Sequence, residues 1–141
     1  MALNVLVVDD SSVMRAMIIK TLKLSGIGLG EVFQAANGAE GLEALDANWI
    51  DLALVDINMP VMNGEEMIDR VRGMPETADL PLVVVSTESS ETRIRALRQK
   101  GAWFVHKPFT PEALRATIVE ITGVTDGAIA EGAVPSSGPD F

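Results

Sequence analysis

Short apolar runs alternate with amphipathic stretches along most of the chain. Residues 4–8, 52–56 and 82–85 form short runs rich in Val and Leu, without the polar alternation of a half-exposed strand. Such runs are typical of strands buried on both faces, as in parallel sheets. Residues 31–35 and 103–105 carry weaker strand signals. The pattern therefore predicts five strands.

A helical period follows each strand. After the first strand, the spacing i, i+3, i+4, i+7 predicts one helical face made of Met14, Met17, Ile18, Thr21, Leu22 and Ser25. Ser11 or Ser12 is the expected N-cap, and Gly26 the expected stop. The other predicted helices are residues 38–45 capped by Asn37, 65–72, 91–100, and 111–122 capped by Thr110.

The alternation of strands and helices predicts an α/β fold with a parallel sheet covered by helices on both faces. The small architecture that fits five such units is the flavodoxin-like (βα)5 fold with strand order 2-1-3-4-5. A chain of 141 residues is long enough for one domain, which we place at residues 1–122. Residues 123–141 are rich in Gly, Ala, Pro and Ser, and we interpret them as a tail or linker.

Composition narrows the class of function. The net charge of −9 argues against nucleic-acid binding, which depends on a basic surface. No apolar run reaches the length of a membrane span, and there is no signal peptide, so we expect a cytoplasmic protein. The absence of Cys excludes disulfides, thiolate metal sites and cysteine nucleophiles.

Carboxylates follow two of the apolar runs directly. Asp9 and Asp10 end the first strand and Asp56 ends the third, and these strands are neighbours in the predicted order. Three like charges at one rim share a proton or bind a cation, and Mg²⁺ or Mn²⁺ is the cation that suits them. A carboxylate left over can attack phosphorus as a nucleophile. The fourth strand ends in Ser86 and the fifth in Lys107, a hydroxyl and an ammonium that can contact phosphoryl oxygens.

The order of these motifs resembles the receiver domain of two-component response regulators over about residues 3–122. The matching motifs are Asp9-Asp10, Asp56 with Met59-Pro60 and Gly64, Ser86, and Lys107-Pro108-Phe109. The opening stretch, residues 9–15, is most similar to single-domain chemotaxis regulators of the CheY type. The resemblance implies a phosphorylation-activated signalling switch, which is not a turnover enzyme.

The resemblance also implies a role for each matching residue. Asp56 would accept a phosphoryl group from the phosphohistidine of a histidine kinase. Mg²⁺ would be bound by Asp10, Asp56 and the backbone carbonyl of Asn58, with Asp9 acting through water. Lys107 would contact the phosphoryl group, and its peptide bond to the following proline is expected in cis.

Ser86 and Phe104 would form the conformational switch in this comparison. Asn58, Thr87 and Glu88 would tune dephosphorylation. The sequence departs from the family at four points in this region. The stretch from Gly101 to Phe104 is one residue shorter than usual, and Phe104 replaces the common Tyr. Trp103 is unusually large for its place, and Thr87 is bulkier than the usual small residue.

The expected partners are a histidine kinase and a downstream protein, such as a flagellar motor switch or another effector. The downstream protein would dock on the face formed by residues 91–100, 103–105 and 111–122, and the protein itself is expected to be a monomer. Four basic residues lie in the predicted helix 91–100, and they form either a solvated surface or a docking site for an acidic segment: Arg93, Arg95, Arg98 and Lys100.

Other functions remain open beside the switch. The chain can be a phosphorelay intermediate that passes phosphate to a histidine phosphotransferase, or a receiver fragment of a larger regulator. An aspartate-nucleophile phosphatase is disfavoured, because such enzymes place a second acid two residues after the nucleophile, where this chain has Asn58. An acidic first loop disfavours a flavin phosphate, and no Walker loop is present.

Overall fold

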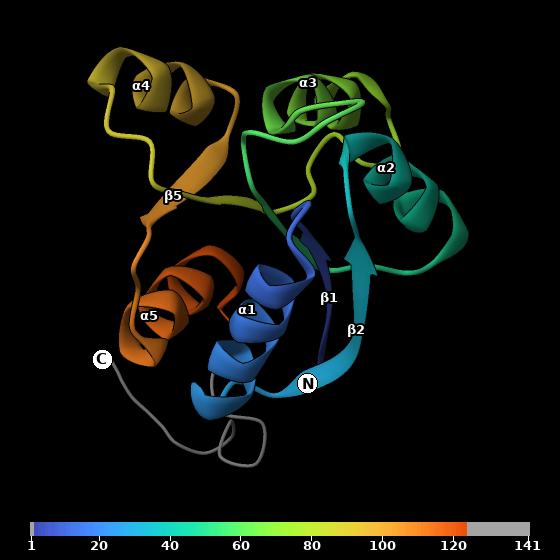
Figure 1. Ribbon diagram of the computed structural model, residues 1–141. Helices are drawn as coiled ribbons and strands as arrows, with labels where there is room; N and C mark the ends of the chain where they lie inside the picture. Colours follow the sequence, from blue (N-terminus) through green and yellow to red (C-terminus); the bar gives the residue numbers. More distant parts are fainter. Residues whose placement is uncertain (1, 124–141) are drawn as a thin grey trace.

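Strands and helices alternate five times in the computed structural model, which describes residues 2–123 (Figure 1). The elements are β1 (Leu3–Val8), α1 (Ser12–Leu24), β2 (Leu29–Ala35), α2 (Gly38–Ala47), β3 (Leu52–Val55), α3 (Gly64–Gly73), β4 (Leu82–Ser86), α4 (Glu91–Gln99), β5 (Ala102–His106) and α5 (Pro111–Thr122). Each predicted strand and helix is confirmed, with boundaries that differ by at most a few residues.

The five strands form one parallel sheet in the order β2-β1-β3-β4-β5. The predicted flavodoxin-like topology is therefore confirmed. Helices α1 and α5 cover one face of the sheet, and α2, α3 and α4 cover the other, as Figure 1 shows. All five strands end at the same edge, because they are parallel, and the loops that follow them gather there.

The sheet separates the apolar core into two layers. Alternate residues of β1 point to opposite faces, so Val5 and Val7 pack with α1 and α5, while Leu6 and Val8 pack with the other three helices. The central strands β3 and β4 are buried along their whole length. Their uninterrupted apolar sequence follows from this burial on both faces.

Capping side chains fix where the helices begin. The Ser11 hydroxyl accepts a hydrogen bond from the Met14 amide at the start of α1, and Thr110 accepts one from Ala113 at the start of α5. Asn63 and Glu66 form a reciprocal capping box at the start of α3. The Lys107-Pro108 peptide bond is cis, as predicted.

The predicted helical face of α1 is buried only in part. Ile18 and Leu22 are buried, whereas the Met17 side chain is 56% exposed. Successive helical residues are about 100° apart, so Met17 lies well to one side of the stripe that meets the sheet. β2 begins at Leu29, two residues earlier than predicted.

The C-terminal end of α5 agrees with the predicted boundary. Gly123 caps the helix in the left-handed conformation, with φ 75°. The predicted tail beyond it, residues 124–141, lies outside the described residues. Among residues 2–123, no helix has the length and apolar character needed to cross a membrane.

Candidate functional site

Three carboxylates meet where β1 and β3 end. Val8 pairs with Val55 in the sheet, and the Asp56 amide donates a hydrogen bond of 2.9 Å to the Val8 carbonyl. The residues after each strand therefore emerge side by side. Carboxylate oxygens of Asp9, Asp10 and Asp56 lie within 4.8 Å of one another. The predicted acidic cluster thus forms in the structure.

The three carboxylates differ in their surroundings. Asp9 is only 2% exposed, and its Oδ1 accepts a hydrogen bond of 2.9 Å from the Ser11 amide. Asp56 is half-buried, and its Oδ1 accepts one of 2.8 Å from the Ile57 amide. Asp10 is exposed to solvent. A buried, an intermediate and an exposed carboxylate together form a site open on one side.

Lys107 brings the one cation that pairs with this cluster among the described residues. Its Nζ lies 3.4 Å from Asp9 Oδ2 and 3.8 Å from Asp56 Oδ1. The Lys107 amide donates a 2.9 Å hydrogen bond to the Ser86 carbonyl, which anchors the residue at the ends of β4 and β5. One ammonium balances only part of the charge of three carboxylates.

The excess negative charge affects the protonation of Asp56. Burial raises the pKa of its carboxyl above the usual value, and the neighbouring Asp9 and Asp10 raise it further. Lys107 and the Ile57 amide act in the opposite direction but do not cancel the rise. A divalent cation relieves this repulsion, and a set of oxygen donors is what Mg²⁺ prefers. The residues present therefore fit a magnesium site.

Ser86 and Phe104 lie on neighbouring strands beside the cluster. Ser86 is buried at the end of β4, and its hydroxyl accepts a hydrogen bond of 3.1 Å from the Glu88 amide. Phe104 is half-buried on β5, where its ring contacts the His106 ring edge to face, with centroids 4.7 Å apart. Ser86 and His106 are paired in the sheet, so the two predicted switch residues belong to one strand pair.

The residues predicted to tune dephosphorylation lie in the loops after β3 and β4. Asn58 and Thr87 are exposed. The Glu88 carboxylate instead contacts α4, where it accepts a hydrogen bond from the Ser90 amide and pairs with Arg93 at 3.2 Å. Asn58 follows the end of β3 and the other two follow the end of β4, and their kinetic role stays a prediction.

Two arginines support the site in ways that sequence reasoning missed. Arg15 of α1 donates a hydrogen bond of 2.6 Å to the Asp9 carbonyl and one of 3.0 Å to Gln34 of β2. Arg93 of α4 joins Glu65 of α3 at 2.7 Å and Glu88 at 3.2 Å. The position of Arg15 one helical turn after the Ser11 cap was a usable signal, whereas the partners of Arg93 come from distant segments.

The chain matches a family of known proteins. A family model described as the response regulator receiver domain matches residues 5–119. The chain belongs to this family. Receiver domains of the CheY chemotaxis type are among its relatives. The chemotaxis protein CheY1 of Helicobacter pylori is 37% identical over 126 residues, which cover 88% of this chain and all of that protein.

A solved receiver domain shows the same architecture. The high-resolution structure of the chemotaxis response regulator CheY4 of Vibrio cholerae superimposes with a TM-score of 0.76 and 34% identity, covering 86% of this chain and 99% of that one. A receiver domain can also be part of a larger protein. The autoinducer 1 sensor kinase/phosphatase LuxN of Vibrio campbellii is 38% identical over 113 residues, which are 79% of this chain and only 13% of LuxN.

Proposed function

We propose that this receiver domain is a phosphorylation-activated switch in which Asp56 accepts a phosphoryl group from a histidine kinase. The observation that carries the proposal is the position of Asp56 between two other carboxylates and the Lys107 ammonium. Its relatives among chemotaxis proteins favour a pathway that controls motility. The product is a change of affinity for a protein partner, not a released small molecule.

The transfer needs a nucleophile and a good leaving group. An oxygen of Asp56 attacks phosphorus, and the bond between phosphorus and the donor's imidazole nitrogen breaks. The electron pair of that bond returns to the imidazole, which leaves as a neutral ring when its other nitrogen already carries a proton. Lys107, 3.8 Å from Asp56 Oδ1, is placed to contact a phosphoryl oxygen as charge moves onto the carboxylate.

The neighbouring carboxylates have different roles in the proposed metal site. Asp10, Asp56 and the Asn58 carbonyl would hold Mg²⁺, and the bound ion would neutralise the phosphoryl oxygens during transfer. Asp9 is buried and held by the Ser11 amide and Lys107, so it suits an indirect contact with the ion through water. Arg15 fixes the backbone of Asp9 and thereby the position of this carboxylate.

Phosphorylation would change the structure through the pair β4 and β5. The Ser86 hydroxyl, at the end of β4, accepts a hydrogen bond from the Glu88 amide and can donate its own proton to a phosphoryl oxygen on Asp56. Ser86 also binds the Lys107 amide and is paired with His106, so its movement reaches Phe104 through the same strand. The phosphoryl group shifts the equilibrium only by the difference of its contacts in the two states.

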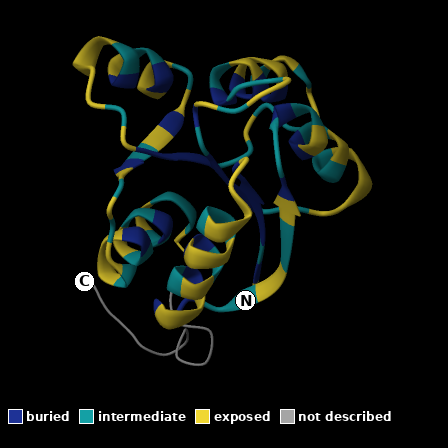
Figure 2. Cartoon of the chain, in the orientation of Figure 1, coloured by how far each residue is buried: buried dark blue, intermediate teal, exposed yellow. Residues whose placement is uncertain are grey.

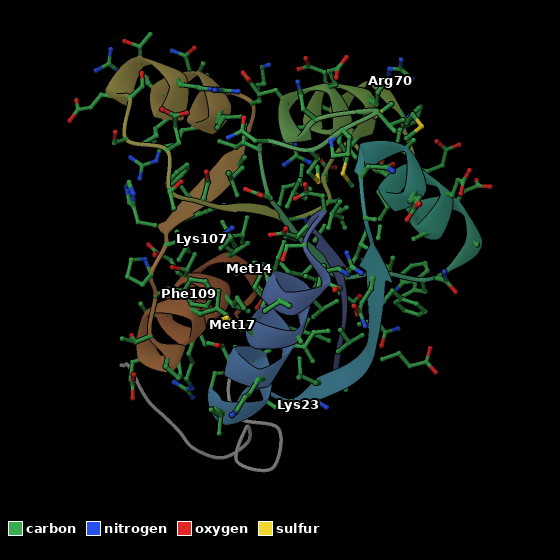
Figure 3. All side chains as sticks on the ribbon, in the orientation of Figure 1. Met14, Met17, Lys23, Arg70, Lys107 and Phe109 are labelled. Atoms are coloured by element: carbon green, nitrogen blue, oxygen red, sulfur yellow. The ribbon has the colours of Figure 1, made fainter. Side chains whose placement is uncertain are left out.

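An apolar hollow beside Lys107 supports a protein, not a free metabolite, as the natural phosphoryl donor. Figure 3 shows Met14 and Met17 of α1 beside Phe109, below Lys107. These side chains line a hollow of about 260 Å³ whose walls are almost entirely apolar. A donor domain that packs an apolar helix here would bring its phosphohistidine close to Asp56.

The basic residues of α4 and the hollow beside them support the predicted docking face for the downstream protein. Of the four basic residues in and after α4, Arg93 and Lys100 pair with carboxylates of the domain, whereas Arg95 and Arg98 have no carboxylate within 4.0 Å among residues 2–123. Arg98 and Trp103 line a hollow of about 510 Å³ next to Phe104. We assign this surface to an acidic downstream partner.

The phosphoacceptor is tested by intact mass after incubation with Mg²⁺ and acetyl phosphate. The wild type and Asp69→Asn, an exposed aspartate on α3, should each gain one phosphoryl group, and Asp56→Asn should gain none. Omission of Mg²⁺ should abolish the gain in every sample. A phosphoryl group on Asp56→Asn, or none on the wild type, would overturn the assignment.

The output surface is tested with the phosphorylated protein and its candidate partner. Arg95→Glu with Arg98→Glu should weaken binding at least tenfold, while Lys20→Glu with Lys23→Glu on α1, an equal change of charge, should leave it within twofold. Equal losses in both variants would show that only net charge matters.

A relay function is the second candidate, because the related segment of LuxN lies inside a sensor kinase/phosphatase. Incubation of the phosphorylated domain with a histidine phosphotransfer protein separates the two functions. Rapid movement of the label to its histidine supports a relay, and retention of the label supports a terminal switch.

A further inference from the structure

A third hollow lies at the edge of the sheet opposite Asp56. It has a volume of about 530 Å³ and lies between the segment that follows α2 and the segment that joins α3 to β4. Trp49 forms part of its wall and is 80% exposed. Figure 2 shows the segment after α2 as a continuous exposed stretch at the margin of the molecule. An exposed Trp is unusual, because Trp is highly buried on average.

Trp49 is held in this exposed position by its polar atoms. Its indole Nε1 donates a hydrogen bond of 3.0 Å to Asp51 Oδ1, and Asp51 Oδ2 accepts one of 2.9 Å from the Asn4 amide. The Asn4 side chain donates in turn to the Trp49 carbonyl at 3.0 Å. The indole N–H is satisfied within the domain, so the ring face is the part left for a ligand. A ring fixed in advance loses little freedom on binding.

The charged side chains that line the hollow are all acidic, and one of them, Asp79, interacts with the Arg72 guanidinium. Asp46, Glu76 and Asp79 line the hollow, and no Lys, Arg or His is among its lining residues in the described part of the chain. Helix α2 ends at the hollow with no basic residue in its last turn, so the partial negative charge of its terminal carbonyls is not compensated there. The site therefore combines an aromatic face with an excess of negative charge.

We infer that this hollow binds an arginine-bearing segment of another protein, independently of phosphorylation. A guanidinium can stack on the Trp49 ring while it pairs with the carboxylate of Asp46 or Glu76. The residues after Gly123 do not supply such a group, because 124–141 contain no Lys, Arg or His. A second copy is disfavoured, because two chains of net charge −9 repel each other.

The test is binding of a labelled Gly-Arg-Gly-Arg-Gly peptide, measured by fluorescence anisotropy in 0.15 M salt. Trp49→Ala should weaken binding at least fivefold, and Asp46→Asn with Glu76→Gln should do the same. Matched controls are Trp103→Ala, on β5, and Glu91→Gln with Glu112→Gln, at the opposite edge of the sheet. Both controls should stay within twofold of the wild type, because they leave the hollow intact.

Further measurements decide between this inference and its alternatives. A peptide with Lys in place of Arg should bind at least threefold more weakly, and phosphorylation of Asp56 should change affinity less than twofold. Equal losses of affinity in the control variants and in the variants of the hollow would show that binding depends only on net charge. The absence of saturable binding at millimolar peptide would exclude the site. Self-association of the wild type that Trp49→Ala abolishes would assign the hollow to a second copy. Each of these three results overturns the inference.

Discussion

The acidic cluster around Asp56 and the surroundings of Arg72 are both half-buried groups of charge, but they are satisfied to different degrees. The Arg72 guanidinium donates hydrogen bonds to four backbone carbonyls, at 2.7–3.1 Å. Those carbonyls belong to Ala78, Leu80, Lys100 and Gly101, so Arg72 joins α3 to two separate turns. The three carboxylates instead face one ammonium at 3.4 and 3.8 Å.

This difference separates a structural charge from a functional one. Arg72 has partners for most of its donors, so the folded chain gains stability from it and leaves nothing for a ligand. Asp56 keeps the like charges of Asp9 and Asp10 beside it, and a bound cation relieves the repulsion that the fold leaves. Chemistry is thus placed where the fold leaves charge uncompensated. Four substitutions test this contrast, and the largest expected effect comes first.

Arg72→Ala should lower the free energy of unfolding by about 3 kcal/mol, because it leaves several carbonyls without their charged donor. Arg72→Lys should lose most of the same amount, since an ammonium cannot span both turns. Arg70→Ala, at an exposed neighbour on α3 (Figure 3), should change the free energy of unfolding by less than about 0.5 kcal/mol. Urea denaturation measures all three, and similar losses for Arg70 and Arg72 would contradict the structural role.

Gly64→Ala should lower the free energy of unfolding by about 2 kcal/mol and slow the phosphorylation of Asp56 at least tenfold. An added Cβ would overlap the Asp56 carbonyl oxygen and approach the Ile57 Cα to 3.0 Å, so the backbone under the phosphoacceptor must move. Gly73→Ala, at the other end of α3, has no heavy atom within 4 Å of the new Cβ and should be neutral or slightly stabilising. Acetyl phosphate kinetics and denaturation compare the two; equal behaviour would argue against close packing at Gly64.

Asp56→Asn should raise the free energy of unfolding of the metal-free protein at neutral pH. The size of this change should be smaller than that of the loss caused by Gly64→Ala. The folded-state pKa of Asp56 is raised above 3.8, so its ionisation costs stability as pH rises from 3.8 through the raised value. Below 3.8 both states are protonated and the two proteins should converge. Thermal unfolding against pH, with a chelator present, measures the difference. Saturating Mg²⁺ should reverse the order, and a gap that persists at low pH would refute the electrostatic cause.

Val61→Asn should stabilise by about 0.5–1 kcal/mol, the smallest effect of the four. Val61 adopts φ 67° in a tight turn closed by a 2.7 Å hydrogen bond from the Met62 amide to the Pro60 carbonyl. A β-branched residue is strained there, whereas Asn tolerates it. The Val61 side chain is 83% exposed, so little packing is lost. Val13→Asn, also exposed but helical, should instead destabilise slightly, and stabilisation by both would show that strain is not the cause.

The sheet and the acidic cluster were predictable because each is signalled by local sequence patterns, the apolar runs of the strands and the carboxylates that directly follow them. The uninterrupted apolar sequence of the strands indicates that they are buried on both faces. The carboxylates of Asp9 and Asp56 directly follow two neighbouring strands. The four carbonyl partners of Arg72 were not predictable, because they depend on how two distant turns approach α3. The strain at Val61 and the exposure of Trp49 likewise depend on the path of loops, for which the sequence carries no periodic signal.

The partition of the core by the sheet affects how this protein can vary. The buried side chains of the α1 and α5 layer and those of the α2, α3 and α4 layer form separate clusters. A cavity opened at Ile118 on one side cannot be refilled by a larger residue at Met67 on the other. Compensating substitutions must therefore arise within one layer, so the two layers of this protein can diverge at different rates while the strands between them stay the same.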